Sequence, residues 1–131
     1  KMNNFIFELQ ASLVKGKNSG SIPLAHLPPF FANFNCDYKI SSKSSVKFYT
    51  LYNDWKYDED FDVNGVDNLE EATNDGTPMW YTFNLNFTHQ INDKLIISVA
   101  LENMMDYHYK TFASGISANG RNLILNLQSR F

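Results

Sequence analysis

Acidic residues gather in one segment of this 131-residue chain, positions 57–78, which holds eight of the fourteen Asp and Glu side chains. A calcium-loop pattern, D-x-[DN]-x-[DN]-G-x5-E, is matched there by Asp60, Asp62, Asn64, Gly65 and Glu71. Oxygen atoms at alternate positions can converge on one hard cation, the glycine permits a sharp turn, and the final glutamate adds a bidentate carboxylate. The segment therefore predicts a calcium site whose ligands are Asp60, Asp62, Asn64 and Glu71, with calcium as the possible cofactor.

A solvated acidic loop is the alternative interpretation of the same segment. Asp67 stands where the calcium pattern has an apolar residue, and the flanking segments have the alternation of strands instead of the paired helices of an EF-hand. The negative charge could also attract a cationic ligand, whose identity the charge does not specify.

Other residue types limit the chemistry further. Cys36 is the only cysteine, which excludes an intramolecular disulfide and a cysteine metal cluster. There is no HExxH motif, nucleophile elbow or phosphate loop, so we expect that the protein is not an enzyme. The net charge of −3 argues against a nucleic-acid partner.

The elements that must position these residues are strands, because apolar residues recur with period two. Leu95, Ile97, Val99 and Leu101 alternate with more polar neighbours, for example. The same alternation predicts six long strands in an all-β fold, at about 3–14, 30–40, 45–55, 79–90, 95–102 and after Arg121. No run of about 20 apolar residues exists, so no transmembrane helix is expected.

The connections between these strands alternate in length. Segments 42–45 and 91–94 are tight turns, whereas 15–29, 56–78 and about 107–120 are long. Outer-membrane barrels have this asymmetry, with short periplasmic turns, long external loops and aromatic residues near the strand ends. A soluble sandwich or lipocalin-like barrel with a bound ligand would also show strand alternation, and it stays open as an alternative.

The histidines divide between the two ends of this arrangement. His26 and His108 fall in long connections on the external side and could contribute to a metal or haem site, while His89 lies at the opposite end. Met104 and Met105 could be soft metal ligands, but packing at the end of a strand explains them as well.

A family resemblance rests on the last third of the chain. Its residues Glu102, Asn103, Asp106 and Tyr109, followed by Gly120, Arg121 and the terminal Phe131, resemble the carboxy-terminal signature of TonB-dependent outer-membrane receptors. Met104 and Met105 replace the usual Leu-Phe of that signature. The segment from Pro23 to Phe30 is similar to a Pro-Leu-x-x-Ile-Pro-Pro segment that leads into a barrel strand of these receptors.

The resemblance implies an antiparallel up-and-down meander that forms the last six strands of a 22-stranded transmembrane β-barrel. Residues 1–131 would then be a carboxy-terminal segment, with the plug domain and the earlier strands outside it. The parent would import a scarce nutrient, such as a ferric siderophore, haem, cobalamin or another metal complex, across the outer membrane of a Gram-negative bacterium.

The partners that the resemblance implies are outer-membrane lipid, the plug and remaining barrel of the parent, TonB through the missing amino-terminal part, and the outer-membrane assembly machinery. The residues do not choose among the ligands. A surface calcium-binding or adhesive β-protein is the second functional hypothesis, and a soluble ligand-binding β-barrel is the third.

Overall fold

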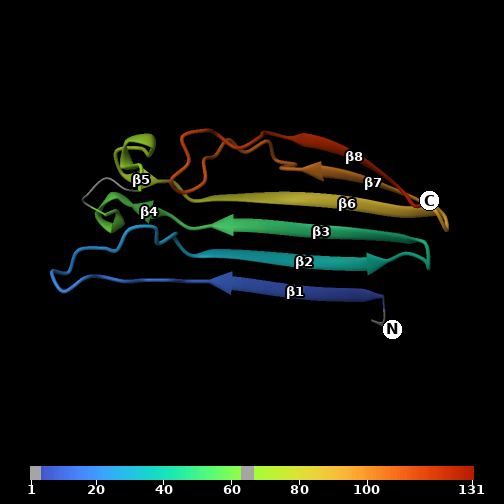
Figure 1. The fold of residues 1–131 in the computed structure, drawn as a ribbon, viewed down its shortest axis with the longest axis horizontal. Helices are drawn as coiled ribbons and strands as arrows, with labels where there is room; N and C mark the ends of the chain where they lie inside the picture. Colours follow the sequence, from blue (N-terminus) through green and yellow to red (C-terminus); the bar gives the residue numbers. More distant parts are fainter. Residues whose placement is uncertain (1–3, 63–66) are drawn as a thin grey trace.

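The chain folds into one long antiparallel sheet in the computed structural model, which describes residues 4–62 and 67–131 (Figure 1). The sheet order is β1-β2-β3-β6-β7-β8, so each long strand pairs with the next one along the chain. The strands are β1 (Phe5–Ser12), β2 (Phe31–Lys39), β3 (Ser44–Asn53), β6 (Trp80–Asn92), β7 (Leu95–Glu102) and β8 (Asn122–Ser129). No helix among the described residues has the length and hydropathy of a membrane span.

The predicted meander of six strands is confirmed, with small differences at the boundaries. β6 runs through Ile91 and Asn92, which the sequence pattern places in the turn 91–94, so the turn consists of Asp93 and Lys94. A shift in register between Gln90 and Asn92 accommodates the additional strand residues. The expected start of the first strand at Asn3 lies outside the described residues.

The second long connection contains structure that alternation did not predict. Lys56–Tyr57 (β4) pairs with Gly76–Thr77 (β5) in a separate two-stranded sheet. Two single 3-10 turns, Asp58–Asp60 (η1) and Leu69–Glu71 (η2), follow β4 and precede β5. Four residues of strand are too few to show a period, which is why the pattern missed them.

The cross-strand register places apolar residues beside apolar residues and polar residues beside polar residues. One row across the sheet is Phe7, Cys36, Phe48, Leu85, Leu101 and Leu123. Its neighbour on the opposite face is Glu8, Asn35, Tyr49 and Asn84. Directly opposed residues of antiparallel strands share a face, so the sheet has one apolar and one polar face.

Burial is the reverse of that in a soluble sandwich. The buried apolar residues among those described are Phe61, Trp80 and Ala100, whereas Leu9 and Leu125 on the apolar face are 72% and 69% exposed. Polar Thr82 and Asn84 are buried on the other face. An apolar surface of this extent is expected to meet lipid or another protein, and polar burial suits a barrel interior.

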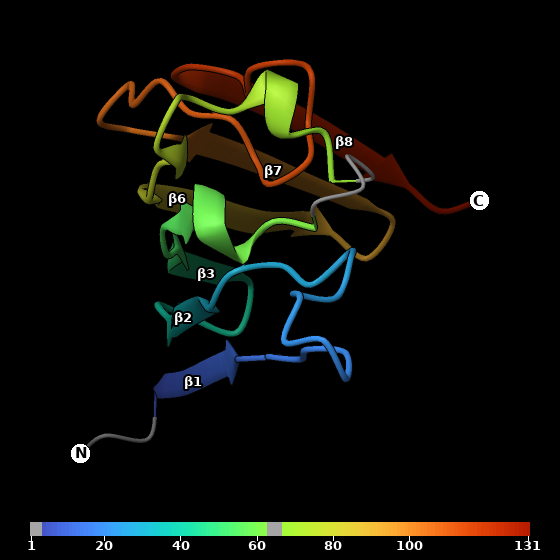
Figure 2. The same ribbon diagram turned by 90° about the vertical axis from the view of Figure 1, so that its left-hand side faces the viewer.

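Long connections leave one end of the sheet and short turns the other (Figure 1). We call them the first loop (13–30), the second loop (54–79) and the third loop (103–121). Figure 2 views the molecule from this end and shows the three loops side by side over the curving sheet. At the opposite end, the Ser44 hydroxyl and His89 Nδ1 are 2.8 Å apart, as expected for a histidine on the short-turn side.

Candidate functional site

The third loop is closed at its base by a buried asparagine. Asn103 follows β7 with a φ of 47° and is 3% exposed. Its side-chain amide donates to the carbonyls of Tyr107 at 2.8 Å and Asn119 at 3.1 Å, and its side-chain carbonyl accepts from the Tyr107 N–H at 2.9 Å. Asparagine suits this position because it tolerates the left-handed region and both donates and accepts. One side chain thereby holds both ends of the loop.

Asp106 makes a second closure beside Asn103. Asp106 Oδ1 accepts the backbone N–H of Arg121 at 2.7 Å, and Arg121 Nε donates to the carbonyl of Met104 at 3.1 Å. A Cβ at Gly120 would stand 2.6 Å from Asp106 Oδ1, so a larger residue there would displace the carboxylate that accepts from the Arg121 N–H. We call Asn103, Asp106, Gly120 and Arg121 the third-loop stem, and it contains four of the seven signature residues.

The other signature residues lie around this stem or beyond it. The Tyr49 hydroxyl donates to Glu102 Oε1 at 2.8 Å. Tyr109 stacks on Trp80 with ring centroids 4.2 Å apart. Burial, and then the nearby Glu102 carboxylate, raise the pKa of Tyr109, so its hydroxyl stays protonated at neutral pH. Phe131 is exposed beyond the end of β8 and takes no part in the stem.

A buried lysine joins the three loops. Lys56 is 6% exposed, and its ammonium donates to the Leu27 carbonyl of the first loop at 2.8 Å. The same ammonium lies 5.5 Å from the ring centre of Phe61 and 5.1 Å from that of Phe112 in the third loop. Both are cation–π distances, and the two rings meet edge-on with centroids 5.7 Å apart. The lysine thus contacts residues of every loop.

Asp67 brings a buried negative charge to this group. The residue is 1% exposed, and its Oδ1 accepts the backbone N–H of His26 at 2.7 Å. Burial lowers the pKa of Lys56, while the carboxylates of Asp67 and Asp60 act in the opposite direction. The two charges therefore attract each other through space, although the recorded contacts of the Asp67 carboxylate are with His26. We call Lys56, Phe61, Asp67 and Phe112 the Lys56 cluster.

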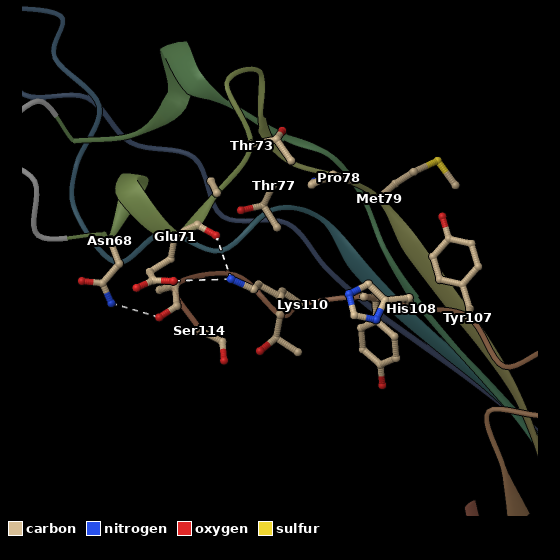
Figure 3. Close-up of a pocket in the computed structure, with 14 residues that line it drawn as sticks. Asn68, Glu71, Thr73, Thr77, Pro78, Met79, Tyr107, His108, Lys110 and Ser114 are labelled. Atoms are coloured by element: carbon tan, nitrogen blue, oxygen red, sulfur yellow. Dashed lines mark hydrogen bonds and ion pairs between the residues drawn. The ribbon is translucent and has the colours of Figure 1, made fainter. Parts of the chain in front are cut away.

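A cavity of about 320 Å³ opens between the second and third loops (Figure 3). This volume is near the lower limit for small-molecule pockets, about 300–1,000 Å³. Lys110 Nζ lies 3.4 Å from Glu71 Oε2 and 3.3 Å from the Glu71 carbonyl. The walls include Glu71, Thr77, Met79, His108, Tyr109 and Lys110.

A wider groove of about 630 Å³ lies between the first and second loops. Its apolar wall contains Leu13, Leu24, Leu27, Phe30, Trp55 and Tyr57. The two hollows lie on either side of the second loop, so all three loops contribute surface that could contact a ligand.

The described residues of the calcium pattern have different surroundings. Asp60 ends η1 and is exposed, Asp62 is buried, and Glu71 is paired with Lys110. Asn64 and Gly65 lie outside the described residues. Within the described part of the chain, no group of three or more His, Cys, Asp or Glu side chains could hold a metal ion. Calcium binding by this segment stays a prediction.

That prediction has a direct calorimetric test. If the segment binds calcium, replacing both Asp60 and Glu71 with alanine should abolish the heat of calcium binding, because two carboxylate ligands are lost. Asp58→Ala combined with Glu70→Ala is the matched control, since it removes the same charge at positions outside the pattern. The absence of a calcium signal in the unchanged protein would contradict the site.

His26 and His108, the two histidines on the long-loop side, have different local partners. His26 Nδ1 lies 3.4 Å from Asp67 Oδ1, and His108 Nε2 lies 3.4 Å from the Ser117 hydroxyl. Met105 is exposed and Met104 is partly buried beside the third-loop stem. Among the described residues, these histidine and methionine side chains form no shared metal site.

Sequence reasoning missed the Lys56 cluster. Its members come from positions 56, 61, 67 and 112, a spacing that follows no local period. One signal was present, because Lys56 is the only Lys, Arg or His among the nine acidic residues of positions 54–79. A single cation in such a segment has many carboxylates available as partners.

Comparison with known proteins supports the architecture alone. No protein-family model matches the chain, and no curated protein matches it. Among solved structures, the copper transporter OprC superposes with a TM-score of 0.83 at 18% identity, covering 98% of this chain and 21% of its own. Two mutants of the ferric enterobactin receptor PfeA from Pseudomonas aeruginosa give TM-scores of 0.70 and 0.69, each at 16% identity.

These matches include nearly all of the chain and a small part of each neighbour. The alignments with the two PfeA mutants cover 98% and 97% of this chain, and each covers 20% of the PfeA chain. The chain thus spans about a fifth of the length of the receptors that it resembles. It has the fold of the carboxy-terminal barrel part of a TonB-dependent receptor.

Proposed function

We propose that residues 1–131 are the carboxy-terminal barrel segment of a TonB-dependent outer-membrane receptor in a Gram-negative bacterium. The observation that carries this proposal is the combination of an exposed apolar sheet face with a buried polar one, over a meander that matches receptor barrels along 98% of the chain. The third-loop stem adds support, since Asp106 and Arg121 of the signature bond to each other and Asn103 closes the loop through Tyr107 and Asn119.

The whole protein is then a transporter, and the chain contributes a wall and three external loops. Its partners are outer-membrane lipid on the apolar face, the plug and the remaining strands of a 22-stranded barrel on the polar face and edges, and TonB through the plug-bearing part. The outer-membrane assembly machinery inserts it. The protein carries out no catalysis of its own.

The cargo that we propose is a scarce metal complex. The neighbours are named as a copper transporter and a ferric enterobactin receptor, which supports a metal-containing nutrient and does not choose between the two. The exposed apolar face speaks against the soluble ligand-binding barrel, because water would cover residues such as Leu9 and Leu125.

Uptake measurements test the transport function. The gene that encodes this chain should also encode a plug and a TonB-contacting segment, and its deletion should reduce accumulation of radiolabelled copper or of a ferric siderophore. Deletion of tonB should have the same effect. Unchanged accumulation of both metals in the gene deletion, under metal limitation, would count against the proposal.

A charge on each face tests the membrane orientation. Val99→Arg should prevent outer-membrane assembly, because Val99 lies in the apolar row with Phe87 and Leu125 and a charge there costs about 2–4 kcal/mol at mid-membrane. Ser98→Arg is the matched control, since Ser98 is on the polar face beside Thr88 and Asn126. Assembly is measured by fractionation and heat-modifiable electrophoresis, and equal tolerance of both variants would refute this orientation.

A further inference from the structure

Two opposite charges face each other in the cavity between the second and third loops. Glu71 comes from η2 and Lys110 from the third loop, and both line the cavity wall (Figure 3). Their charged atoms are 3.4 Å apart, and their side chains are 43% and 35% exposed. A solvent-exposed ion pair at this distance contributes little to folding stability, so a ligand can separate the two charges at a small cost in free energy.

Further contacts hold residues beside the pair. The Asn68 side chain donates to the Ala113 carbonyl at 3.0 Å, which ties the two loops together beside the pair. Tyr109 also lines the cavity, and its ring stacks on Trp80 with centroids 4.2 Å apart. The cavity therefore has a carboxylate and an ammonium on walls that other contacts help to hold in place.

The charge balance of the cavity selects among ligand classes. A purely anionic group would be attracted by Lys110 but repelled by the Glu71 carboxylate. A purely cationic group would be attracted by Glu71 but repelled by Lys110. A group that carries an ammonium and a carboxylate a few bonds apart would replace both halves of the pair at once. Complementarity of this kind gives specificity more than raw affinity.

We infer that this cavity binds the zwitterionic amino-carboxylate end of a ligand, with the carboxylate on Lys110 and the ammonium on Glu71. This inference rests on the proposed receptor function and specifies the chemical class of chelator that the receptor would take. The bound group must be compact, since the cavity of about 320 Å³ accommodates only a small molecule or one arm of a larger complex.

Three dipeptide probes test the inference on the full-length protein that the gene encodes, purified in detergent. Glycylglycine carries both charges, N-acetylglycylglycine carries only the carboxylate, and glycylglycinamide carries only the ammonium. By calorimetry or saturation-transfer NMR, glycylglycine should bind about tenfold more tightly than either analogue, since each analogue loses one charge-assisted contact.

Single variants should reproduce these losses one charge at a time. Lys110→Gln should reduce glycylglycine affinity to that of glycylglycinamide, and Glu71→Gln should reduce it to that of N-acetylglycylglycine. The double variant Glu71→Lys with Lys110→Glu keeps one charge of each sign and should restore binding. Lys17→Gln and Glu70→Gln are matched controls, because neither residue lines this cavity.

Failure of this inference differs from failure of the proposed function. Undetectable glycylglycine binding, or equal binding of all three probes, overturns the zwitterion site whatever the uptake measurements show. Binding in detergent requires no TonB and no transport, so selective glycylglycine binding upholds the site even where deletion of the gene leaves metal uptake unchanged.

Discussion

Replacing Lys56 with methionine should destabilise the packing of the three loops by about 3–5 kcal/mol. The change removes a charged hydrogen bond to the Leu27 carbonyl and the cation–π contacts with Phe61 and Phe112. Methionine keeps the apolar stem between Phe61 and Phe112 but removes the ammonium. The Leu27 carbonyl then loses its donor, and the buried Asp67 carboxylate loses a nearby positive charge. The expected result is faster opening of all three loops together, because the lysine contacts each of them.

Amide hydrogen exchange measures this opening directly. Loop amides such as His26, which donates to Asp67, should exchange at least about a hundredfold faster in Lys56→Met. Lys15→Met is the control at an exposed site. Adding Asp67→Asn should recover only a small part of the loss, because it removes the carboxylate charge near Lys56 but restores neither the Leu27 hydrogen bond nor the cation–π contacts. Unchanged exchange in the single variant would show that Lys56 does not stabilise the loops.

Asn103→Ala should open the third-loop stem by about 3–5 kcal/mol. The change leaves the Tyr107 carbonyl, the Asn119 carbonyl and the Tyr107 N–H without partners. Alanine also loses the tolerance of asparagine for a positive φ, here 47°. We expect exchange of the Arg121 amide, which is bonded to Asp106, to accelerate at least about a hundredfold.

Two further variants make this result specific. Asn103→Asp retains the acceptor for the Tyr107 N–H and loses both donors, so its effect should be intermediate. Asn119→Ala changes an exposed side chain while keeping the carbonyl that Asn103 contacts, and should leave the stem unaffected. Equal exchange in Asn103→Ala and Asn119→Ala would mean that the backbone alone closes the loop.

The strands were predictable because sheet register acts on every second residue. Phe7, Cys36 and Phe48 share a row, so each strand repeats the same requirement and a short pattern in the sequence is sufficient to find it. The extension of β6 to Asn92 was not predictable, since the register shift that permits it depends on the geometry of the partner strand.

The loop contacts were not predictable for a different reason. His26 and Asp67 are 41 positions apart, and no local preference encodes such a pairing. Asp67 departs from the calcium pattern, and the structure gives it a definite place in the Lys56 cluster. The signature residues were recognisable as a set in the sequence. The role of Gly120 was not predictable, because it depends on the Asp106 carboxylate, which lies beside it only in the folded loop.

The position of the third-loop stem has a consequence for how this surface can diverge. The stem joins Asn103 to Asn119 and Asp106 to Arg121 at the base of the loop, next to the ends of β7 and β8. Changes in the length of the segment beyond the stem should therefore leave the pairing of β7 with β8 in place. The stem separates the part of the loop that contacts the second loop, through Lys110 and Ala113, from the strand pairing that holds the sheet together.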